Sequence, residues 1–334
     1  MTVSNEISWI QNAHRGFGHC RPEDDYLHTE GHPVGASATE TYFFGFHVPE
    51  HRLHGTIYLW AHPNLKVLTG GVMIGTGFQP CSLAADYFNI HAYLALDEHV
   101  DPVSGLISLP GPLRVQPVKP FEQWRITLDD RTADTSFDLS FTAAMPPAVR
   151  ADDKHFDQNM HVVGDLVLRG ARIEVDCYEI RDRSWHNLRP ETPLPTSPYN
   201  WLTLARGADF AMNLSLFDDL SLLPSAQGVL QVPAPALQDG WVYRDGALRR
   251  IVECAKRTER TSALRPMHHQ IRAVDDEGRI YEIAGEIIAG NTWNGWPNQI
   301  WHRCLTRWTC NGLELWGDTQ EVQWHEAVRQ FRLA

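Results

Sequence analysis

The chain has 334 residues, of which 43% are hydrophobic and 21% are charged, as expected for a folded globular protein. Its formal net charge of -12 argues against nucleic acid or an anionic membrane as the main partner, because both bind through concentrated Lys and Arg. The first residues lack a basic and apolar signal sequence, and no apolar run is long enough to span a bilayer. We therefore expect a cytoplasmic protein without membrane insertion.

No motif for a cofactor or a metal is found in the sequence. The six cysteines include no C-x-x-C pair, and the glycine-rich turns are not followed by the helix that a phosphate cradle needs. His47, His51 and His54 lie on a predicted strand, turn and strand, which does not match the histidine spacing of a helical zinc site. The absence of a G-x-S-x-G motif disfavours a serine hydrolase, and we predict neither a cofactor nor a metal.

The first half of the chain has the pattern of a β protein. Residues 1–40 hold many polar and turn residues without clear periodicity, and we interpret them as an irregular arm. After this arm, apolar residues alternate with polar ones in short runs bounded by Gly, Pro and Asp, which is typical of strands. The predicted strands span residues 42–48, 53–60, 66–74, 88–96, 113–118, 121–128 and 135–143.

The second half repeats the same pattern after a break. Pro146 and Pro147 end a strand and are followed by small or charged residues, so we predict one domain at residues 1–150 and another at 151–334. Further strands are predicted at residues 162–168, 171–180, 201–204, 209–216, 230–232, 240–243, 248–254, 269–274 and 279–288. Many short strands and no clear helix indicate an all-β chain folded as two barrels or curved sandwiches.

The most unusual stretch spans residues 178–190, where many charged and aromatic residues follow a strand. Arg169 and Gly170 predict the hairpin turn that leads into this strand. On it, Glu179, Arg181 and Arg183 continue the face of an apolar stripe, so they need charged partners, and Glu179 could pair with Arg181. The residue types alone fit equally a buried ion-pair knot at the end of the barrel and a functional site.

The last predicted hairpin allows its register to be derived. If Asn311 and Gly312 form a two-residue turn, Cys310 pairs with Leu313, and the pairing continues to His302 opposite Glu321. A carboxylate in that position can orient an imidazole for acid/base catalysis. The alternative is a hydrogen bond that only closes the end of a barrel.

A family resemblance rests on two motifs of the second half. The glutamine-containing strand at residues 156–164 and the block Arg181-Asp182-Arg183-Ser184-Trp185 resemble those of an uncharacterised bacterial family. That family is similar to the AttH-type, carotenoid 1,2-hydratase-like superfamily. The resemblance implies two lipocalin-like β-barrels in tandem, with a ligand pocket associated with the Asp-x-x-Trp block. It does not imply one reaction, because superfamily members include hydratases, cyclising enzymes and proteins without an assigned activity.

The block departs from the family pattern in two ways. Members of the family usually carry Gly where this chain has His186, and Arg189 is spaced by one more position. An imidazole beside Asp182 and Trp185 titrates near neutral pH, so we select His186 as the preferred proton-transfer residue.

Together these observations predict a lyase, hydratase or isomerase that acts by acid/base catalysis, without a cofactor, on a hydrophobic small molecule. The substrate class is aromatic, such as a phenylpropanoid-type compound, or isoprenoid. Asp182 would act as the acid or anchor the geometry, and Arg181 or Arg183 would stabilise developing oxyanion charge. The full set of candidates comprises Asp182, His186, Arg183, Arg181, Glu321 and His302 for catalysis, and Trp185, Tyr178, Trp296, Trp293, His161 and Tyr58 for substrate binding.

Other interpretations remain open at the level of sequence. A lipocalin-type carrier would use the same pocket without chemistry, and the first domain could mediate a homodimer. The aromatic stretch at residues 293–297 is suited to a turn that closes over a ring, or to a packed loop anchor. The proline-rich stretch at residues 190–198 could form a rim or a lid.

Overall fold

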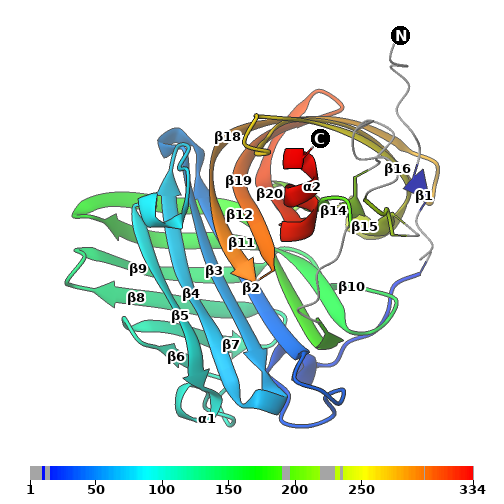
Figure 1. Cartoon of the computed structure of the whole chain (residues 1–334). Coiled ribbons are helices and arrows are strands. Elements are labelled where there is room, and N and C mark those ends of the chain that lie inside the picture. Colours follow the sequence, from blue (N-terminus) through cyan, green and yellow to red (C-terminus); the bar gives the residue numbers. More distant parts are fainter. Residues whose placement is uncertain are drawn as a thin grey trace.

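The computed structural model describes residues 10–11, 16–189, 196–218, 230–233, 236–296 and 298–333. The predicted all-β class is confirmed: antiparallel strands form two strongly curved sheets, one of them closed, which lie against each other as tandem barrels (Figure 1). The few helices among the described residues are short, and none is long and apolar enough to cross a membrane.

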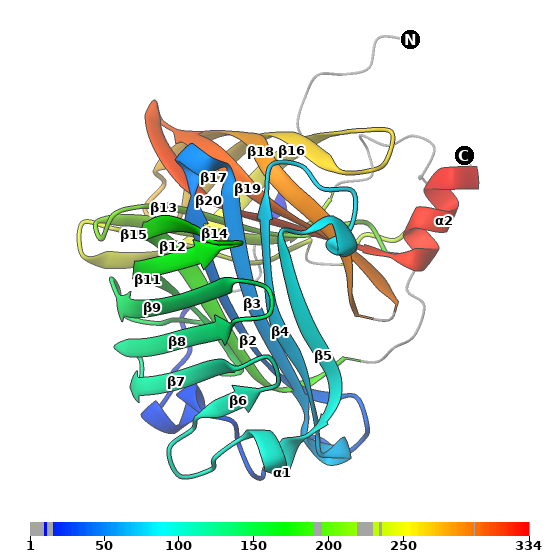
Figure 2. The same cartoon turned by 90° about the vertical axis from the view of Figure 1, so that its left-hand side faces the viewer.

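The first sheet has eleven strands and is nearly closed. Its order is β5-β4-β3-β2-β12-β11-β9-β8-β7-β6, as Figure 2 shows from the side. The short strand β10 pairs with β11. The strands are β2 (Ala38–Val48), β3 (Leu53–His62), β4 (Val67–Thr76), β5 (Tyr87–Ala95), β6 (Ile107–Leu109), β7 (Leu113–Lys119), β8 (Gln123–Asp130), β9 (Thr135–Ala143), β10 (Ala148–Val149), β11 (His155–Leu168) and β12 (Ala171–Leu188). Short helical turns lie at η1 (Pro22–Asp25), η2 (Pro49–His51), η3 (Pro63–Leu65), η4 (Ser82–Ala84) and α1 (Leu96–His99).

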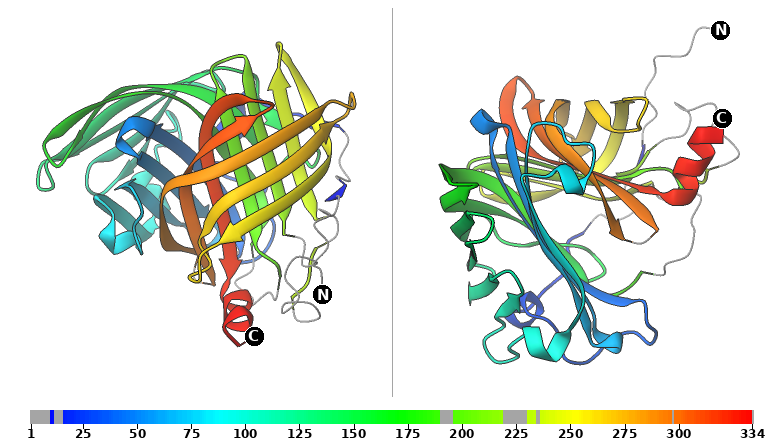
Figure 3. Two further views of the ribbon diagram at one scale, coloured as in Figure 1. Left: turned by 90° about the horizontal axis from the view of Figure 1, so that it is seen from above. Right: turned by 60° about the vertical axis from the view of Figure 1, so that its left-hand side comes forward.

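The second sheet closes into an eight-stranded barrel because β16 pairs with β17 as well as with β15. Its order, starting next to β16, is β15-β14-β13-β20-β19-β18-β17, and β1 also pairs with β16. Figure 3 shows the molecule from above. The elements are β1 (Ile10–Gln11), β13 (Tyr199–Arg206), β14 (Phe210–Phe217), β15 (Leu237–Arg244), β16 (Ala247–Arg260), β17 (Pro266–Asp275), β18 (Ile280–Trp296), β19 (Gln299–Cys310), β20 (Leu313–Trp324) and α2 (His325–Leu333).

The division between the sheets differs from the boundary expected at residue 150. Strands β11 and β12 pair with β9 and β2, so the Arg-Asp-Arg-Ser-Trp block lies in the first sheet and not in the second. The chain bends at Pro146 and Pro147, but β10 and β11 then pair with each other, which keeps the chain in the same sheet. It enters the second sheet only at β13. Of the proline-rich stretch proposed as a rim, residues 190–195 lie outside the described residues.

The hairpin of β11 and β12 sets the register of the block. Arg169 and Gly170 both have positive φ, of 50° and 81°, as the predicted two-residue turn requires. Pairing then runs without interruption from Leu168 opposite Ala171 to His155 opposite Ser184. The block is therefore part of a long strand and does not follow one. Opposite β2, the register of β12 shifts in a bulge between Ser184 and Asn187.

The charges on the block are neutralised by partners from distant segments. Arg181 binds Asp25, with Nη1 2.8 Å from Oδ1, and Arg183 binds Glu40, with Nη2 2.5 Å from Oε2; all four side chains are buried. Glu179 does not pair with Arg181 but lies 3.1 Å from Nδ1 of His47. For Arg181 and Arg183, the structure thus supports the interpretation as a buried ion-pair knot.

We predict that Arg181→Leu lowers the free energy of unfolding by about 3–5 kcal/mol, because it leaves the buried Asp25 carboxylate without its cation. Urea denaturation followed by circular dichroism measures this. Adding Asp25→Asn should recover part of the loss. The exposed pair of Arg125 and Asp138 provides the control, and Arg125→Leu should have little effect. Equal effects of Arg181→Leu and Arg125→Leu would contradict the prediction.

Candidate functional site

A cavity of about 480 Å³ lies between the two sheets. Its size is in the usual range for a small-molecule site. The first sheet contributes mainly polar and charged side chains, whereas the second contributes most of the aromatic ones. The lining residues are Thr41, Tyr58, Arg150, His155, Asp182, Ser184, Asn187, Leu188, Arg189, Tyr199, Trp201, Phe217, Gln238, Trp296, Asn298, Gln299, Trp301, Gln320, Val322 and Trp324.

A chain of hydrogen bonds runs from the cavity into the contact between the sheets. Ser184 Oγ lies 2.7 Å from Nδ1 of His155, and Nε2 of His155 lies 3.1 Å from Oδ1 of Asp157. Asp157 also accepts hydrogen bonds from the indole nitrogens of Trp201 at 3.3 Å and Trp241 at 2.9 Å. The ring of His155 is thus held at both nitrogens, by a carboxylate that the second barrel fixes in place.

The ionisation of Asp157 is favoured by these contacts. Burial by itself would raise the pKa of its carboxyl group, but the charge of His155 and the hydrogen bonds from His155 and Trp241 lower the pKa overall. Asp157 therefore acts as a fixed negative charge behind the imidazole.

Asp182 has the opposite environment. It stands across the β11–β12 pair from Asp157 and lines the cavity, and burial raises the pKa of its carboxyl group, with Asp157 adding to the effect. Its Oδ1 is buried and has no hydrogen-bond partner among the described residues. Two neighbouring carboxyl groups with pKa values moved in opposite directions are the usual basis for assigning an acid and a charge-stabilising group.

Two guanidinium groups complete the polar part of the cavity. Arg189 lies 5.6 Å from the ring centre of Trp296, and its Nη1 lies 3.5 Å from the hydroxyl oxygen of Tyr58. Nε of Arg150 is 3.6 Å from Oδ2 of Asp239. Both arginines can stabilise negative charge on a bound molecule while the aromatic wall contacts its apolar part.

Comparison of the sequence with protein families gives one match over most of its length. Residues 21–326 match the model described as Domain of unknown function (DUF7064). The chain belongs to this family. No curated protein matches this member of DUF7064.

Solved structures resemble this DUF7064 chain in fold. The AttH-like protein of Nitrosomonas europaea has a TM-score of 0.60 at 12% identity, covering 92% of this chain and 97% of its own. CghA has a TM-score of 0.54 at 11% identity, with coverage of 96% and 99%. Kievitone hydratase from Nectria haematococca has a TM-score of 0.51 at 8% identity, again with coverage of 96% and 99%. The AttH-type fold expected from the sequence is therefore confirmed.

Of the twelve residues selected from the DUF7064 sequence, the structure brings three to the cavity: Asp182, Tyr58 and Trp296. Arg181 and Arg183 are held by Asp25 and Glu40, away from it. The remaining substrate-binding candidates do not line the cavity. Trp185 packs with Val149 and Phe156, and His161 stacks on Tyr178 and binds Asp176. Trp293 packs against Tyr58, Trp60 and Trp301. Trp293 and Trp296 lie in β18, and Pro297 is outside the described residues.

His186, the preferred proton-transfer residue, does not line the cavity. It lies in the bulge of β12 with a φ of 52°, and its ring contacts His28 and His32 of the arm. Burial, together with His28, lowers the pKa of its imidazole. Because the bulge adds a residue to the strand, the side chain of residue 186 no longer follows Asp182 and Ser184.

The predicted register of the last hairpin is confirmed, with His302 directly opposite Glu321. The two side chains nevertheless have different partners: Nδ1 of His302 lies 2.9 Å from Thr292 Oγ1, and Glu321 binds Arg260. Burial lowers the pKa of His302 to about 4. Neither residue lines the cavity, so the structure separates this pair from the candidate site.

Sequence reasoning missed His155 and Asp157, and it did not select Ser184 as a candidate. The position of His155 could have been derived from the sequence, because a two-residue turn at Arg169 and Gly170 places His155 opposite Ser184. The turn at Asn311 and Gly312 places His302 opposite Glu321 in the same way. The indole groups that bind Asp157 belong to the other sheet, so no local sequence pattern predicts their contact with it.

We predict that Asp182→Asn raises the melting temperature at neutral pH, whereas Asp157→Asn lowers it. A carboxyl group whose pKa is raised by folding costs stability once the pH exceeds its ordinary value of 3.8, so removing its charge is stabilising there. The pKa of Asp157 is lowered, so its charge contributes stability above that pH. Thermal unfolding from pH 4 to 8 measures the melting temperatures of both variants. The difference between these two melting temperatures should become smaller toward pH 4. Shifts of the same sign would contradict the assignment.

Proposed function

We propose that this protein is an acid/base enzyme of the hydratase, lyase or isomerase type, acting on an aromatic small molecule between the two barrels. The observation that carries the proposal is the Asp182 carboxyl group, which lines an aromatic cavity with an unpartnered buried oxygen and a raised pKa. Its fold is shared with a protein named kievitone hydratase, which supports a hydratase-type reaction.

The proposed roles follow from the hydrogen bonds. Asp182, protonated, gives its proton to one carbon of a substrate double bond. A water molecule bonds to the other carbon through its oxygen and loses a proton to His155, which Asp157 holds in place. Asp182 then carries a negative charge and His155 a positive one, and proton exchange with solvent restores both. Elimination of water is the reverse, and proton transfer without water moves the double bond.

Turnover can be tested without knowing the substrate. The purified protein is incubated in D₂O with a panel of phenolic compounds that carry alkenes or hydroxyl groups, and mass spectrometry detects gain or loss of water or uptake of deuterium. We predict that Asp182→Asn reduces the rate by about 10²–10⁴-fold, as expected when a general acid is removed. The control Asp176→Asn, a surface carboxylate bound to His161, should retain full rate. Full turnover by Asp182→Asn would overturn the proposal.

The pH dependence gives a second test. Because Asp182 acts in its protonated form, the wild-type rate should fall as the pH rises through its raised pKa. This alkaline limb should be absent from the residual activity of Asp182→Asn. If the rate of Asp182→Asn falls with rising pH as the wild-type rate does, another group is responsible for the fall.

A second candidate function is acyl hydrolysis, favoured by the hydrogen bonds that link Ser184, His155 and Asp157. The variant Ser184→Ala distinguishes the two candidate functions. It should abolish acyl hydrolysis if Ser184 is the nucleophile, and it should leave the acid/base reaction largely intact. Covalent labelling of Ser184 by a fluorophosphonate would favour the hydrolase. A carrier, in contrast, would return every bound ligand unaltered after long incubation.

A further inference from the structure

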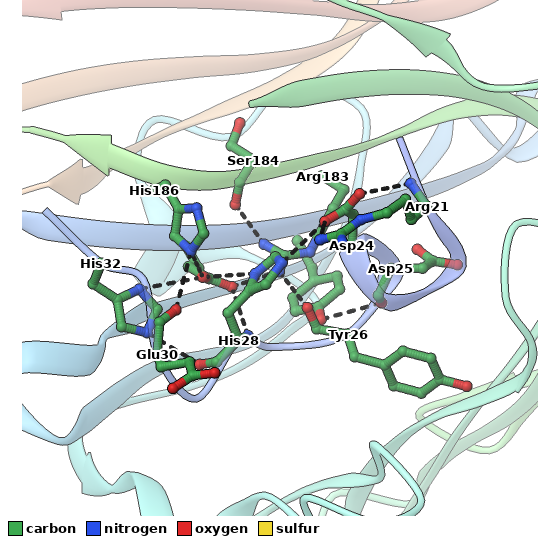
Figure 4. Close-up of polar contacts among 12 residues, drawn as sticks. Arg21, Asp24, Asp25, Tyr26, His28, Glu30, His32, Arg183, Ser184 and His186 are labelled. Carbon is green, nitrogen blue, oxygen red and sulfur yellow. Dashed lines mark hydrogen bonds and ion pairs between the residues drawn. The ribbon is translucent and has the colours of Figure 1, made fainter. Parts of the chain in front are cut away.

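A second cluster of titratable groups lies on the other side of β12 from the cavity. His28 and His32 come from the arm before β2, and His186 comes from the bulge of β12 (Figure 4). Glu40 comes from the start of β2. The three imidazole rings all approach one atom, Oε1 of Glu40: Nδ1 of His28 at 3.0 Å, Nδ1 of His32 at 3.5 Å and Nε2 of His186 at 3.9 Å. Three separate segments therefore meet at a single carboxylate oxygen.

The hydrogen bonds of His32 leave its second nitrogen without a partner. Nε2 of His32 lies 3.1 Å from the carbonyl oxygen of His28, which can only accept, so Nε2 carries the hydrogen. In a neutral ring Nδ1 is then a bare acceptor that faces another acceptor, Glu40 Oε1. This Nδ1 is buried without a hydrogen-bond partner among the described residues, in a side chain only 8% exposed. A positive charge between the two atoms would resolve the conflict.

The outer contacts orient the other groups in the way that metal ligands are oriented. Nε2 of His28 lies 3.2 Å from Oδ1 of Asp24, which leaves Nδ1 for a cation. The second oxygen of Glu40 accepts from Arg183, which leaves Oε1. Carboxylate partners behind a ligating histidine are typical of zinc sites. Arg183 pairs with Glu40, and the exposed Arg21 lies 3.8 Å from Asp24, so the formal charges of these pairs cancel. The preference for a cation therefore rests on the lone pairs that converge beside Glu40 Oε1.

We propose that His28, His32, His186 and Glu40 form a zinc site that fastens the arm to β12. The ligand atoms of His28, Glu40 and His186 all lie within 4.8 Å of one another, and a tetrahedral ion with bonds of about 2.0–2.1 Å needs spacings of roughly 3.3 Å. His186 would exchange its 3.3 Å contact with the carbonyl oxygen of Glu30 for the ion. His32 Nδ1 lies 3.5 Å from Glu40 Oε1 but outside this group of three atoms, so its ring would move toward the ion to become the fourth ligand. Four protein ligands would then leave no open position, as in structural zinc sites. No sequence motif indicates this site, because its ligands do not follow a known spacing.

The test measures zinc in the full-length protein. Chelator-treated protein is given one equivalent of Zn²⁺, passed through gel filtration and analysed by mass spectrometry of the metal; about one zinc per chain is expected. Co²⁺ in its place should give the visible absorption of a tetrahedral site. We predict that His32→Gln and His186→Gln each weaken zinc binding by at least about 100-fold, since loss of even an outer partner costs roughly 10–100-fold.

The matched control is His161→Gln, which removes a surface histidine that belongs neither to this cluster nor to the cavity, and which should bind zinc as the wild type does. Zinc should raise the melting temperature of the wild type and of this control, but not of His186→Gln. Wild-type protein that retains no zinc and shows no cobalt bands, or His32→Gln and His186→Gln that bind as tightly as the wild type, would overturn the proposal. The wild-type measurement decides even if a variant fails to fold. Asp182→Asn should keep its zinc, so the proposed zinc site and the proposed activity can be refuted independently.

Discussion

Two buried ion pairs on one side of β12 determine which of its side chains reach the cavity. Arg181 and Arg183 are bound to Asp25 and Glu40 on that side. Successive side chains of a strand point in opposite directions, so Asp182 must point the other way, toward the second barrel. A slip by one residue would leave two buried guanidinium groups without carboxylates, at a cost of several kcal/mol each. Electrostatics therefore fixes the register here as firmly as packing does elsewhere.

The arm before β2 is an integral part of this arrangement. It supplies Asp25 to Arg181, and its histidines meet His186 beside Glu40. The carboxylate of Glu40 serves both groups, since one oxygen binds Arg183 and the other faces the imidazoles. This segment, in which Asp25 lies at the end of the short helical turn η1, is thus held by charge pairs to the strand that also carries the candidate acid.

The sequence predicts local features of this protein well and long-range ones poorly. A two-residue turn transmits its register along a whole hairpin, so the pairing of His302 with Glu321 could be derived correctly. His302 and Glu321 are neighbours in the sheet but do not form a functional pair, because Arg260 from another strand binds Glu321. The cavity itself depends on how two curved sheets pack, and alternation of apolar residues carries no information about that contact. Likewise, the bulge that turns His186 away from Asp182 has no sequence signature.

The two sheets contribute differently to the cavity, and this has a consequence for how such a protein can diversify. Asp182 and His155 come from the first sheet, while Trp201, Trp301 and Trp324 of the second shape the apolar wall. Substitutions in the wall can therefore change which ring systems fit, while the proton-transfer groups keep their hydrogen bonds. Among the described tryptophans, Trp201 and Trp241 donate hydrogen bonds to Asp157, so those two positions have the least freedom to vary. Under the proposed function, a change of substrate would require changes in one barrel while the other is preserved.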